Sequence, residues 1–505
     1  MTSSQQRARY CYLALSIWIF FLMAATYKYL GSNDTATSNS INNNYKLSIN
    51  NQNSISRDFS RNSNFRNKRI FSVCNDPENI NYGSEGLLTS SQWQLKEVIV
   101  LIRHGDRGPL AHIRNISAIN CGLNPKTSSN ILLTQYKNFI NEITQSGHLP
   151  WSQTGPFHGF PLLPSSDSQC HLAQLTYIGV AQLLNIGRML SNVYIKKLQL
   201  ENSTTANVDD ILVYSTKYRR TFQSGLAFLY GFLPPELLTK VQIKESDSVT
   251  FCFTDCACPA ADHYSRLVQE ESNENLESHP AVLNLVREAA SIMYEVPEKS
   301  LFKNPTILKD SLLTYICHDS TLPCIIENQN FLRCIKTDQV ASLFTYIDWE
   351  NQQHTKNVFL KRSCLLKAYG LIRNIVTQML KHVSDSKPKF VLYSGHDWAL
   401  QYLCTALGVK QMNDVTQYAS RLIFEIYKDV SNTQTDTSYG VVSSYMFRFL
   451  ANGRDVTKDL SFCKDNLLKL GYNIYGCKIE AIVRFLHDDY FSSLNVTNFK
   501  DACRL

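Results

Sequence analysis

The sequence lacks several features that would assign a function at once. It has no long basic run with interleaved aromatic residues, and 50 Lys and Arg against 43 Asp and Glu give a net charge of only +7 over 505 residues. This mild excess suits an anionic substrate and argues against nucleic acid as a partner. The cluster Cys252, Cys256 and Cys258 has no second cysteine pair or histidine pair at zinc-finger spacing, so disulfides are the better interpretation.

Charge is also absent from residues 10–27, an apolar run long enough to span a bilayer. Two arginines precede it and favour a cytoplasmic N-terminus, so we expect a type II membrane anchor. The alternative is a signal peptide cleaved near Ala24 and Ala25. The short, Phe-rich span favours the Golgi over the cell surface. The predicted organisation is a cytoplasmic tail at 1–9, a transmembrane signal anchor at 10–28, a stem at 29–70 and a lumenal domain at 71–505.

The stem and the body both indicate the secretory pathway. Half of residues 31–68 are Asn or Ser, which leaves too little apolar surface to offset conformational entropy, so we expect disorder. All cysteines except Cys11 lie in the body, which also carries three of the four glycosylation sequons. This combination indicates an oxidising lumen. The basic segment 66–69 is a candidate processing site that would release the body for secretion, and a solvated tether is the alternative.

The rest of the chain is organised around Leu101–Leu110, with the sequence LIRHGDRGPL. An apolar run, Val98–Ile102, predicts a buried parallel strand, and the glycines and proline that follow predict a turn. Arg103, His104 and Arg107 should then lie at the carboxyl end of a strand, where open α/β sheets bind ligands. Arginine forks match phosphate oxygens, and a neutral imidazole can attack phosphorus. The alternative is a basic loop that only makes ion pairs.

Two more predicted strands end in polar residues of the same kind. The first is followed by a helix with Arg219 and Arg220 at its amino end, where backbone N–H groups favour anions. The second ends in Ser-Gly-His-Asp, which places His396 and Asp397 at a strand end. These strands are predicted at 211–215 and 390–393.

Together these motifs resemble the histidine phosphatases of the two-domain, acid-phosphatase branch. The resemblance implies hydrolysis of phosphate monoesters through a phosphohistidine on His104, whose other ring nitrogen should be held by a backbone carbonyl. Asp397 would protonate the leaving oxygen and later assist water. The family's third phosphate-binding arginine stands in Arg-Thr-x-x-Ser, which matches Arg220 and leaves Arg219 as the alternative. Arg103, Arg107, Arg220 and His396 would bind the phosphoryl group without a metal or other cofactor.

The same resemblance implies an α/β fold with a central, mostly parallel sheet flanked by helices, and the apolar run at 10–27 adds an N-terminal transmembrane helix. The alternation of predicted strands and helices is interrupted between about residues 235 and 385, which predicts an inserted, mainly helical cap lobe. Strands at 421–427 and 445–450 are expected at the sheet edge. The triplet 317–319, Cys-His-Asp, could be a metal site, but a structural role is expected in a Cys-rich loop. Cys503 should tie down the C-terminal tail.

Segments outside these motifs resemble the Golgi members of this branch that act on phosphorylated xylose. They include SGLAFLYGFLP at 224–234, FCFTDCACP at 251–259, RLIFE at 421–425 and DACR at 501–504. The resemblance implies removal of the 2-phosphate from xylose in the glycosaminoglycan–protein linkage region of proteoglycans. A xylose kinase and glycosyltransferases are candidate Golgi partners. The alternatives are a broad-specificity lysosomal or secreted acid phosphatase and a catalytically inactive glycan-binding protein.

Overall fold

The computed structural model describes residues 65–122, 130–202, 204, 206–253, 256–295, 301–327, 331–409, 417–431 and 442–504. The predicted anchor at 10–28 and nearly all of the predicted stem lie outside these ranges. No helix within them is long and apolar enough to cross a membrane. The anchor therefore stays a prediction.

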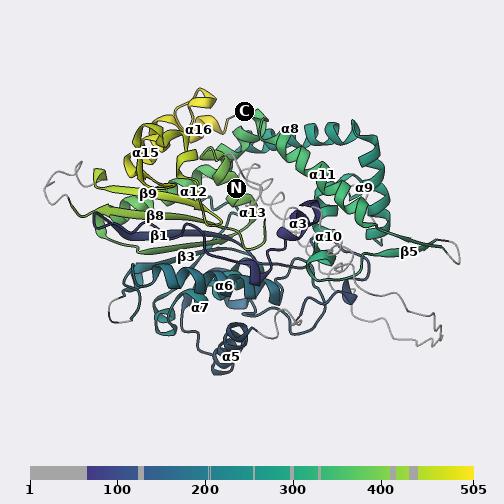
Figure 1. Ribbon diagram of the computed structural model, residues 1–505, viewed down its shortest axis with the longest axis horizontal. Coiled ribbons are helices and arrows are strands. Elements are labelled where there is room, and N and C mark those ends of the chain that lie inside the picture. Colours follow the sequence, from purple (N-terminus) through teal and green to yellow (C-terminus); the bar gives the residue numbers. More distant parts are fainter. Residues whose placement is uncertain are drawn as a thin grey trace, which may run out of the picture. The chain divides into compact units, whose positions relative to one another are not determined.

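The apolar run before the RHGDR motif forms strand β1 (Trp93–Arg103), in the interior of a sheet that has ten strands in the described part of the chain (Figure 1). Residues 98–102 of β1 are completely buried, as expected for a strand covered on both faces. β1 pairs in parallel with β7 (Phe390–Gly395), which pairs in parallel with β3 (Ile211–Thr216). The three strands predicted to carry the motifs therefore end at the same edge of one sheet.

The sheet is mixed, and the prediction of a mostly parallel sheet was wrong. β8 (Arg421–Asp429) pairs antiparallel with β1, and β9 (Tyr445–Ala451) pairs antiparallel with β8. These two strands were expected at the sheet edge, but they lie in its interior. Both strands are almost completely buried because helices cover both sides of the sheet, and burial on both faces is typical of interior strands.

The remaining strands complete the order β11–β12–β9–β8–β1–β7–β3–β4–β2, with β10 paired to β9. They are β2 (Ser152–Gln153), β4 (Gln242–Ser246), β10 (Arg454–Asp455), β11 (Leu467–Gly471) and β12 (Ile474–Lys478). One face is covered by α5 (Ile131–Ser146), α6 (Tyr177–Tyr194) and α7 (Arg219–Phe232). The other is covered by α12 (Val358–Asp385), α13 (Asp397–Ala406) and α15 (Ile479–Arg484), with α16 (Phe499–Ala502) beyond them.

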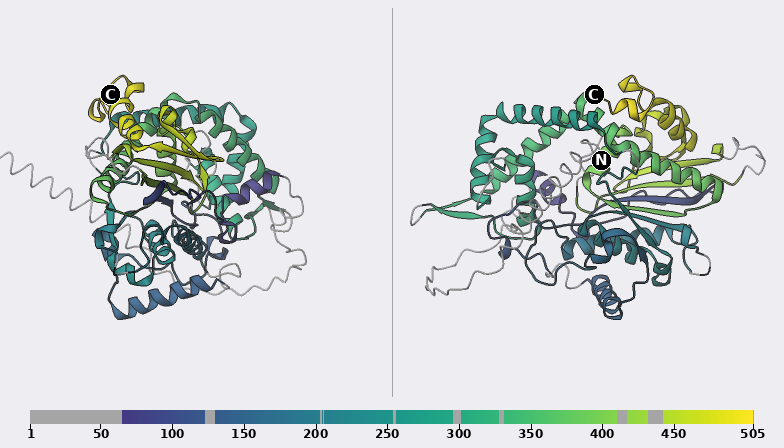
Figure 2. Two further views of the ribbon diagram at one scale, coloured as in Figure 1. Left: turned by 60° about the vertical axis from the view of Figure 1, so that its left-hand side comes forward. Right: turned by 180° about the vertical axis from the view of Figure 1, so that it is seen from behind.

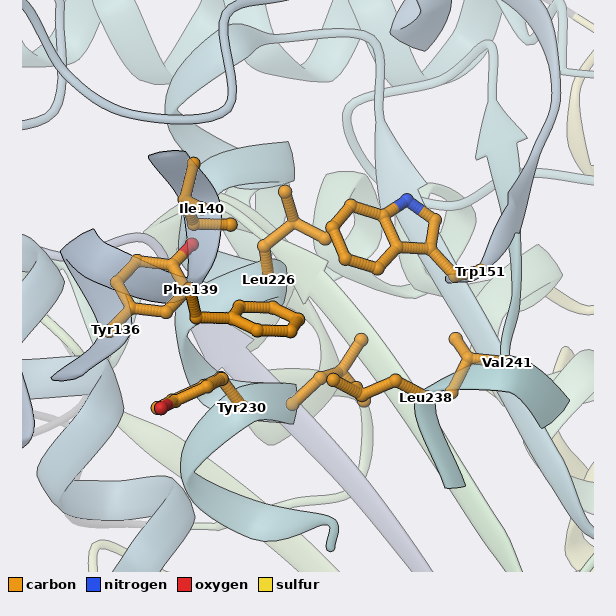
Figure 3. Close-up of a pocket in the computed structure, with 9 residues that line it drawn as sticks. Tyr136, Phe139, Ile140, Trp151, Leu226, Tyr230, Leu238 and Val241 are labelled. Carbon is orange, nitrogen blue, oxygen red and sulfur yellow. The ribbon is translucent and has the colours of Figure 1, made fainter. Parts of the chain in front are cut away.

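Aromatic side chains of the loop before α6 pack within the protein. Phe157 stacks on Phe222 of α7 with ring centroids 4.7 Å apart. Trp151 is buried and lines a small apolar pocket with Tyr136 of α5 and Leu226 of α7 (Figure 3). No charged residue lines this pocket. Trp151 and Phe157 therefore contribute to packing within the protein.

A helical lobe stands beside the sheet (Figures 1 and 2). It consists of α8 (Pro259–Glu277), α9 (Pro280–Met293), α10 (Pro305–Cys317), α11 (Thr337–His354) and the hairpin of β5 (Cys324–Glu327) and β6 (Phe331–Cys334). The last residues of the predicted stem form α3 (Phe65–Ser72), and Ile70 is buried in the core of this lobe. Within the range predicted for the cap, β4 joins the main sheet and α12 packs against it.

The disulfide interpretation of the cysteines is confirmed. The bonds link Cys74–Cys317, Cys121–Cys170, Cys252–Cys256, Cys258–Cys503, Cys324–Cys334 and Cys463–Cys477. Cys503 ties down the C-terminal tail as expected, and Cys364 and Cys404 are buried and free. The Cys74–Cys317 bond joins the lobe to the segment that precedes β1.

Helices α6 and α7 approach each other closely at two glycines. A Cβ on Gly187 of α6 would clash with the carbonyl oxygen of Phe228, and one on Gly231 of α7 would clash with that of Leu184. The two glycines therefore allow the two helices to approach each other closely.

We expect Gly187→Ala to lower the free energy of unfolding by about 1–3 kcal/mol, because the helices must separate to accept a methyl group. Helix propensity alone would predict the opposite sign, since Ala favours helices over Gly. Denaturant unfolding measures the change. Gly159→Ala is the control because a Cβ there meets no atom within 4 Å. Equal stabilities for the two variants would contradict the close approach.

Candidate active site

His104 directly follows β1 and is fixed by its neighbours in the sheet. Its backbone N–H donates to the carbonyl of Gly395 at 2.9 Å, and its own carbonyl accepts from the N–H of Ala419 at 3.1 Å. The ring Nδ1 lies 2.8 Å from the carbonyl oxygen of Gly105. Because a carbonyl can only accept, Nδ1 carries the proton and Nε2 is the basic nitrogen. The predicted backbone acceptor for this imidazole is confirmed.

The surroundings of His104 keep it neutral. Its side chain is almost completely buried, at 2% exposure. Burial lowers the pKa of His104 well below its usual range, and the positive charges of Arg220, Arg103 and Arg107 lower it further. A neutral imidazole with an unprotonated Nε2 is the form that can act as a nucleophile.

His396 lies next to His104, with ring centroids 5.5 Å apart. Its Nδ1 is 3.4 Å from Nη2 of Arg220, and its Nε2 is 3.0 Å from Oγ1 of Thr216 at the end of β3. Because arginine only donates, Nδ1 of His396 accepts and Nε2 donates to Thr216. Burial, followed by the charge of Arg220, lowers the pKa of His396 to about 3. This imidazole is therefore also neutral in the free site.

Three guanidinium groups from two elements meet around these rings. Arg103 ends β1, Arg107 lies four residues further on, and Arg220 is in the first turn of α7. The Nε atoms of Arg107 and Arg220 are buried and have no hydrogen-bond partner among the described residues. Burial and the charge of Arg107 lower the pKa of Arg220 to about 10. Unpartnered buried donors of this kind are costly unless an anion accepts from them.

Asp397 is the first residue of α13 and faces this cluster. Its Oδ2 lies 3.2 Å from Nη2 of Arg103. Burial raises the pKa of Asp397, but the charges of Arg103 and Arg107, aided by His396, outweigh burial and leave it lowered. The carboxyl is therefore ionised in the free site, and a bound phosphate dianion would be needed to return a proton to it.

Comparison with known proteins agrees with this geometry. The sequence profile described as "Histidine phosphatase superfamily (branch 2)" matches residues 94–452, which is most of the chain. The protein belongs to the histidine phosphatase superfamily. It is 32% identical over 419 residues to 2-phosphoxylose phosphatase 1 of Xenopus tropicalis, covering 81% of this chain and 77% of that one.

Other relatives fit the same assignment. The human 2-phosphoxylose phosphatase 1 is 31% identical over 441 residues, which cover 85% of each chain. The lysosomal acid phosphatase of Xenopus laevis is 26% identical over 305 residues, covering 56% of this chain and 66% of that one. The protein is accordingly a phosphatase, with an α/β histidine phosphatase fold.

The structure brings all six predicted site residues of this histidine phosphatase to one sheet edge. They are Arg103, His104, Arg107, Arg220, His396 and Asp397. Arg219 differs from them because its side chain is exposed, whereas Arg220 reaches His396. The roles assigned to these residues stay predictions.

Two further residues complete the site and had no sequence signal. The ring of buried Tyr418 lies 4.5 Å from the guanidinium carbon of Arg103 and 6.0 Å from that of Arg107. Asp310 of α10 accepts from both terminal nitrogens of Arg107, at 2.8 and 3.2 Å. Both lie more than 200 residues after the RHGDR motif, so only the fold places them there.

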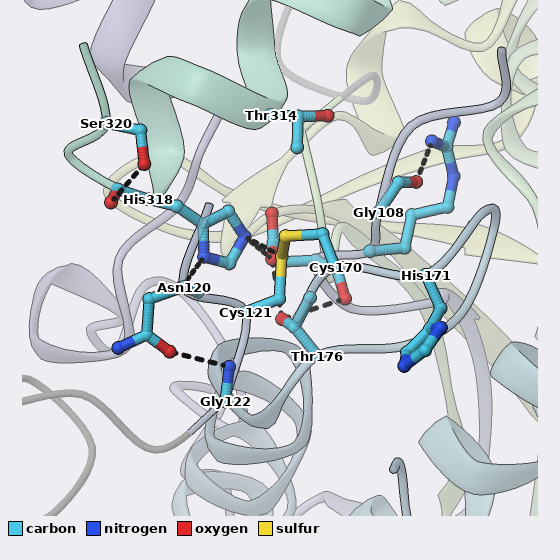
Figure 4. The surroundings of a disulfide bond; sticks show 12 residues. Gly108, Asn120, Cys121, Gly122, Cys170, His171, Thr176, Thr314, His318 and Ser320 are labelled. Atoms are coloured by element: carbon cyan, nitrogen blue, oxygen red, sulfur yellow. Dashed lines mark hydrogen bonds and ion pairs between the residues drawn. A yellow bond between two sulfur atoms is a disulfide. The ribbon is translucent and has the colours of Figure 1, made fainter. Parts of the chain in front are cut away.

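The motif's own aspartate faces away from the phosphate cluster. Asp106 Oδ2 accepts from Thr176 at 2.6 Å and lies 2.8 Å from Nε2 of His318. Figure 4 shows His318 and Thr176 beside the Cys121–Cys170 disulfide. Since Cys317 is disulfide-bonded, the triplet 317–319 has the predicted structural role. No group of His, Cys, Asp and Glu in the described ranges could hold a metal ion.

We expect Arg220→Ala to lower kcat/KM on a small phosphomonoester about 10²–10³-fold, because a buried donor to the developing phosphoryl charge is lost. Arg219→Ala should change it less than about threefold, in line with a solvated charge. Steady-state kinetics and inhibition by inorganic phosphate measure both effects. A larger loss in the Arg219 variant would reverse the assignment.

Proposed function

We propose that this phosphatase removes the 2-phosphate from xylose in the glycosaminoglycan–protein linkage region of proteoglycans. One observation supports this chemistry: a neutral His104, with its Nε2 basic, lies among the guanidinium groups of Arg103 and Arg107, which are buried, and of Arg220, which is half-buried. The substrate is supported by relatives named 2-phosphoxylose phosphatase 1 that align over four-fifths or more of the chain. Broad acid-phosphatase activity is the alternative.

In the proposed first step, Nε2 of His104 attacks phosphorus in line as the bond to the sugar oxygen breaks. Asp397 gives a proton to that oxygen, and the products are a phosphohistidine and the free sugar. In the second step Asp397 takes a proton from water, which attacks phosphorus and releases inorganic phosphate. The three arginines donate to the non-bridging oxygens in both steps, and His396 holds Arg220 beside them.

Leaving-group dependence tests the role of Asp397. A sugar alkoxide is a poor leaving group and needs the proton, whereas a nitrophenolate departs without it. Asp397→Asn should therefore lower kcat/KM, which reports formation of the phosphohistidine and not its hydrolysis, by about 10²–10⁴-fold on a sugar phosphate, and should affect nitrophenyl phosphate much less. Steady-state kinetics on both substrates supply the measurement. The same loss on both would show that Asp397 is not the acid.

Two exposed aromatic side chains adjoin the site and support a sugar as leaving group. Trp398, next to Asp397, is 59% exposed, and Tyr218, whose ring lies 5.0 Å from that of His396, is 41% exposed. The leaving oxygen must lie beside its proton donor, so the sugar lies near Trp398. The C–H groups of a sugar ring can pack on an aromatic face, which carries partial negative charge.

Replacement of Trp398 by Ala should raise KM for a xylose 2-phosphate oligosaccharide about tenfold, with a smaller effect on glycerol phosphate. The N–H that contacts Asp397 at 3.0 Å belongs to the backbone and is retained in the variant. Tyr472→Ala is the matched control, because Tyr472 is an exposed aromatic in the turn between β11 and β12. Proportional losses on the two substrates would argue against a sugar contact.

A Golgi location with a lumenal catalytic domain belongs to the same proposal. It is supported by the apolar run at 10–27, the disulfides, and the exposed sequon residues Asn115, Asn202 and Asn495. A xylose kinase and glycosyltransferases would be partners there. Release by cleavage at 66–69 would require α3 to leave the lobe, where Arg69 pairs with Asp348 at 3.0 Å.

The deciding experiment assays the purified lumenal domain on a xylose-phosphorylated linkage oligosaccharide and on nitrophenyl phosphate. Hydrolysis of the oligosaccharide with the higher kcat/KM supports the proposal. A strong preference for the aryl ester favours a broad acid phosphatase. Equal activity of wild type and His104→Ala would favour a glycan-binding protein without catalysis.

A further inference from the structure

The lobe contributes one carboxylate to the phosphate cluster. Asp310 of α10 accepts from Nη2 of Arg107 at 2.8 Å and from Nη1 at 3.2 Å, and it also accepts from the backbone N–H of Leu110 at 3.0 Å. Both side chains are largely buried. A two-point contact between a carboxylate and a guanidinium fixes the plane of the arginine.

The helix that carries Asp310 is itself fixed to the motif. Its last residue, Cys317, is bonded to Cys74 before β1, and His318, the next residue, contacts Asp106 of the motif at 2.8 Å. Asp310 and His318 thus hold Arg107 and Asp106, two consecutive residues of the same loop. The position of Arg107 depends on an element outside the sheet.

We propose that Asp310 is a positioning residue for phosphoryl transfer: it orients Arg107, and its negative charge favours the protonated form of Asp397 when a phosphate dianion is bound. This inference rests on the proposed function, in which Asp397 is the proton donor to the leaving oxygen. Asp310 does not touch the reacting atoms and acts by orienting Arg107 and by its charge.

A count of formal charges explains why Asp310 favours the protonated form of Asp397. Arg103, Arg107 and Arg220 carry three positive charges, and His104 and His396 are neutral. With Asp310 ionised, a bound dianion balances these charges only if Asp397 is protonated. Without Asp310, the balanced complex has Asp397 ionised. Removal of one carboxylate therefore favours the form that cannot donate a proton.

Other groups near Asp397 do not remove the dependence of its protonation on the charge of Asp310. Lys309 of α10 lies within electrostatic reach of Asp397, but its charge is the same with and without Asp310, so the difference between the two enzymes remains. Tyr402 of α13 is neutral, because the pKa of tyrosine lies above the physiological range and burial raises it further. Tyr418 is neutral for the same reason. The remaining charged neighbours are the arginines already counted.

The test is the pH profile of kcat on a xylose 2-phosphate oligosaccharide, or on glycerol phosphate, for wild type and Asp310→Asn. The basic limb of this profile reports the proton donor in the enzyme–substrate complex. We expect it to move to lower pH by about one unit, because the charged cluster loses one negative charge in a partly polar interior. KM should rise several-fold as Arg107 loses its fixed plane. Asp338→Asn, an exposed carboxylate on α11, is the control.

The outcomes separate the two proposals. If Asp397→Asn leaves the basic limb of an otherwise active enzyme in place, the assignment of Asp397 fails, and with it the basis of this inference. If that limb depends on Asp397 but Asp310→Asn leaves it unshifted, the role of Asp310 is overturned. Should Asp310→Asn fail to fold, Asp310→Glu keeps the charge and must lower kcat without moving the limb. A moved limb in that variant would also overturn the role.

Discussion

Mutual repulsion of three clustered guanidinium groups is the constraint on which this structure depends. Arg103, Arg107 and Arg220 share one sheet edge, and like charges in a partly buried site oppose each other strongly. The carboxylates of Asp397 and Asp310 partly neutralise this charge. The face of the Tyr418 ring also stabilises the guanidinium groups of Arg103 and Arg107. It also keeps both histidines neutral. The remaining positive charge suits a phosphate dianion.

The same constraint explains the close packing beneath the motif. Gly105 and Gly179 touch so closely that a Cβ on either would clash with the other segment's backbone. The N–H of Gly105 donates to Ser224 of α7, and that of Asp106 donates to Gln182 of α6. Because the two helices hold the loop by its backbone, its side chains can all serve the site or the lobe. Rigid support of this kind preorganises a charged site before substrate arrives.

The helical lobe completes the site as well as covering it. Through α10 it reaches Arg107 with Asp310 and Asp106 with His318. The Cys74–Cys317 bond and the buried Ile70 of α3 attach the start of the described chain to the same lobe. Substitutions in the lobe should therefore affect phosphate chemistry as well as the choice of substrate.

The sequence alone determined the reacting groups. Short motifs at three apolar strands predicted the parallel trio β1, β7 and β3, the convergence of His104 with Asp397, and the family. These depend on local order along the chain, because strand, turn and polar residue are consecutive. Tertiary structure decided the rest. β8 could not be placed next to β1 from its own pattern, and Asp310, Tyr418 and His318 reach the motif from more than 200 residues away. Contacts between residues so far apart in the sequence depend on how the whole chain packs, and no local sequence pattern predicts them.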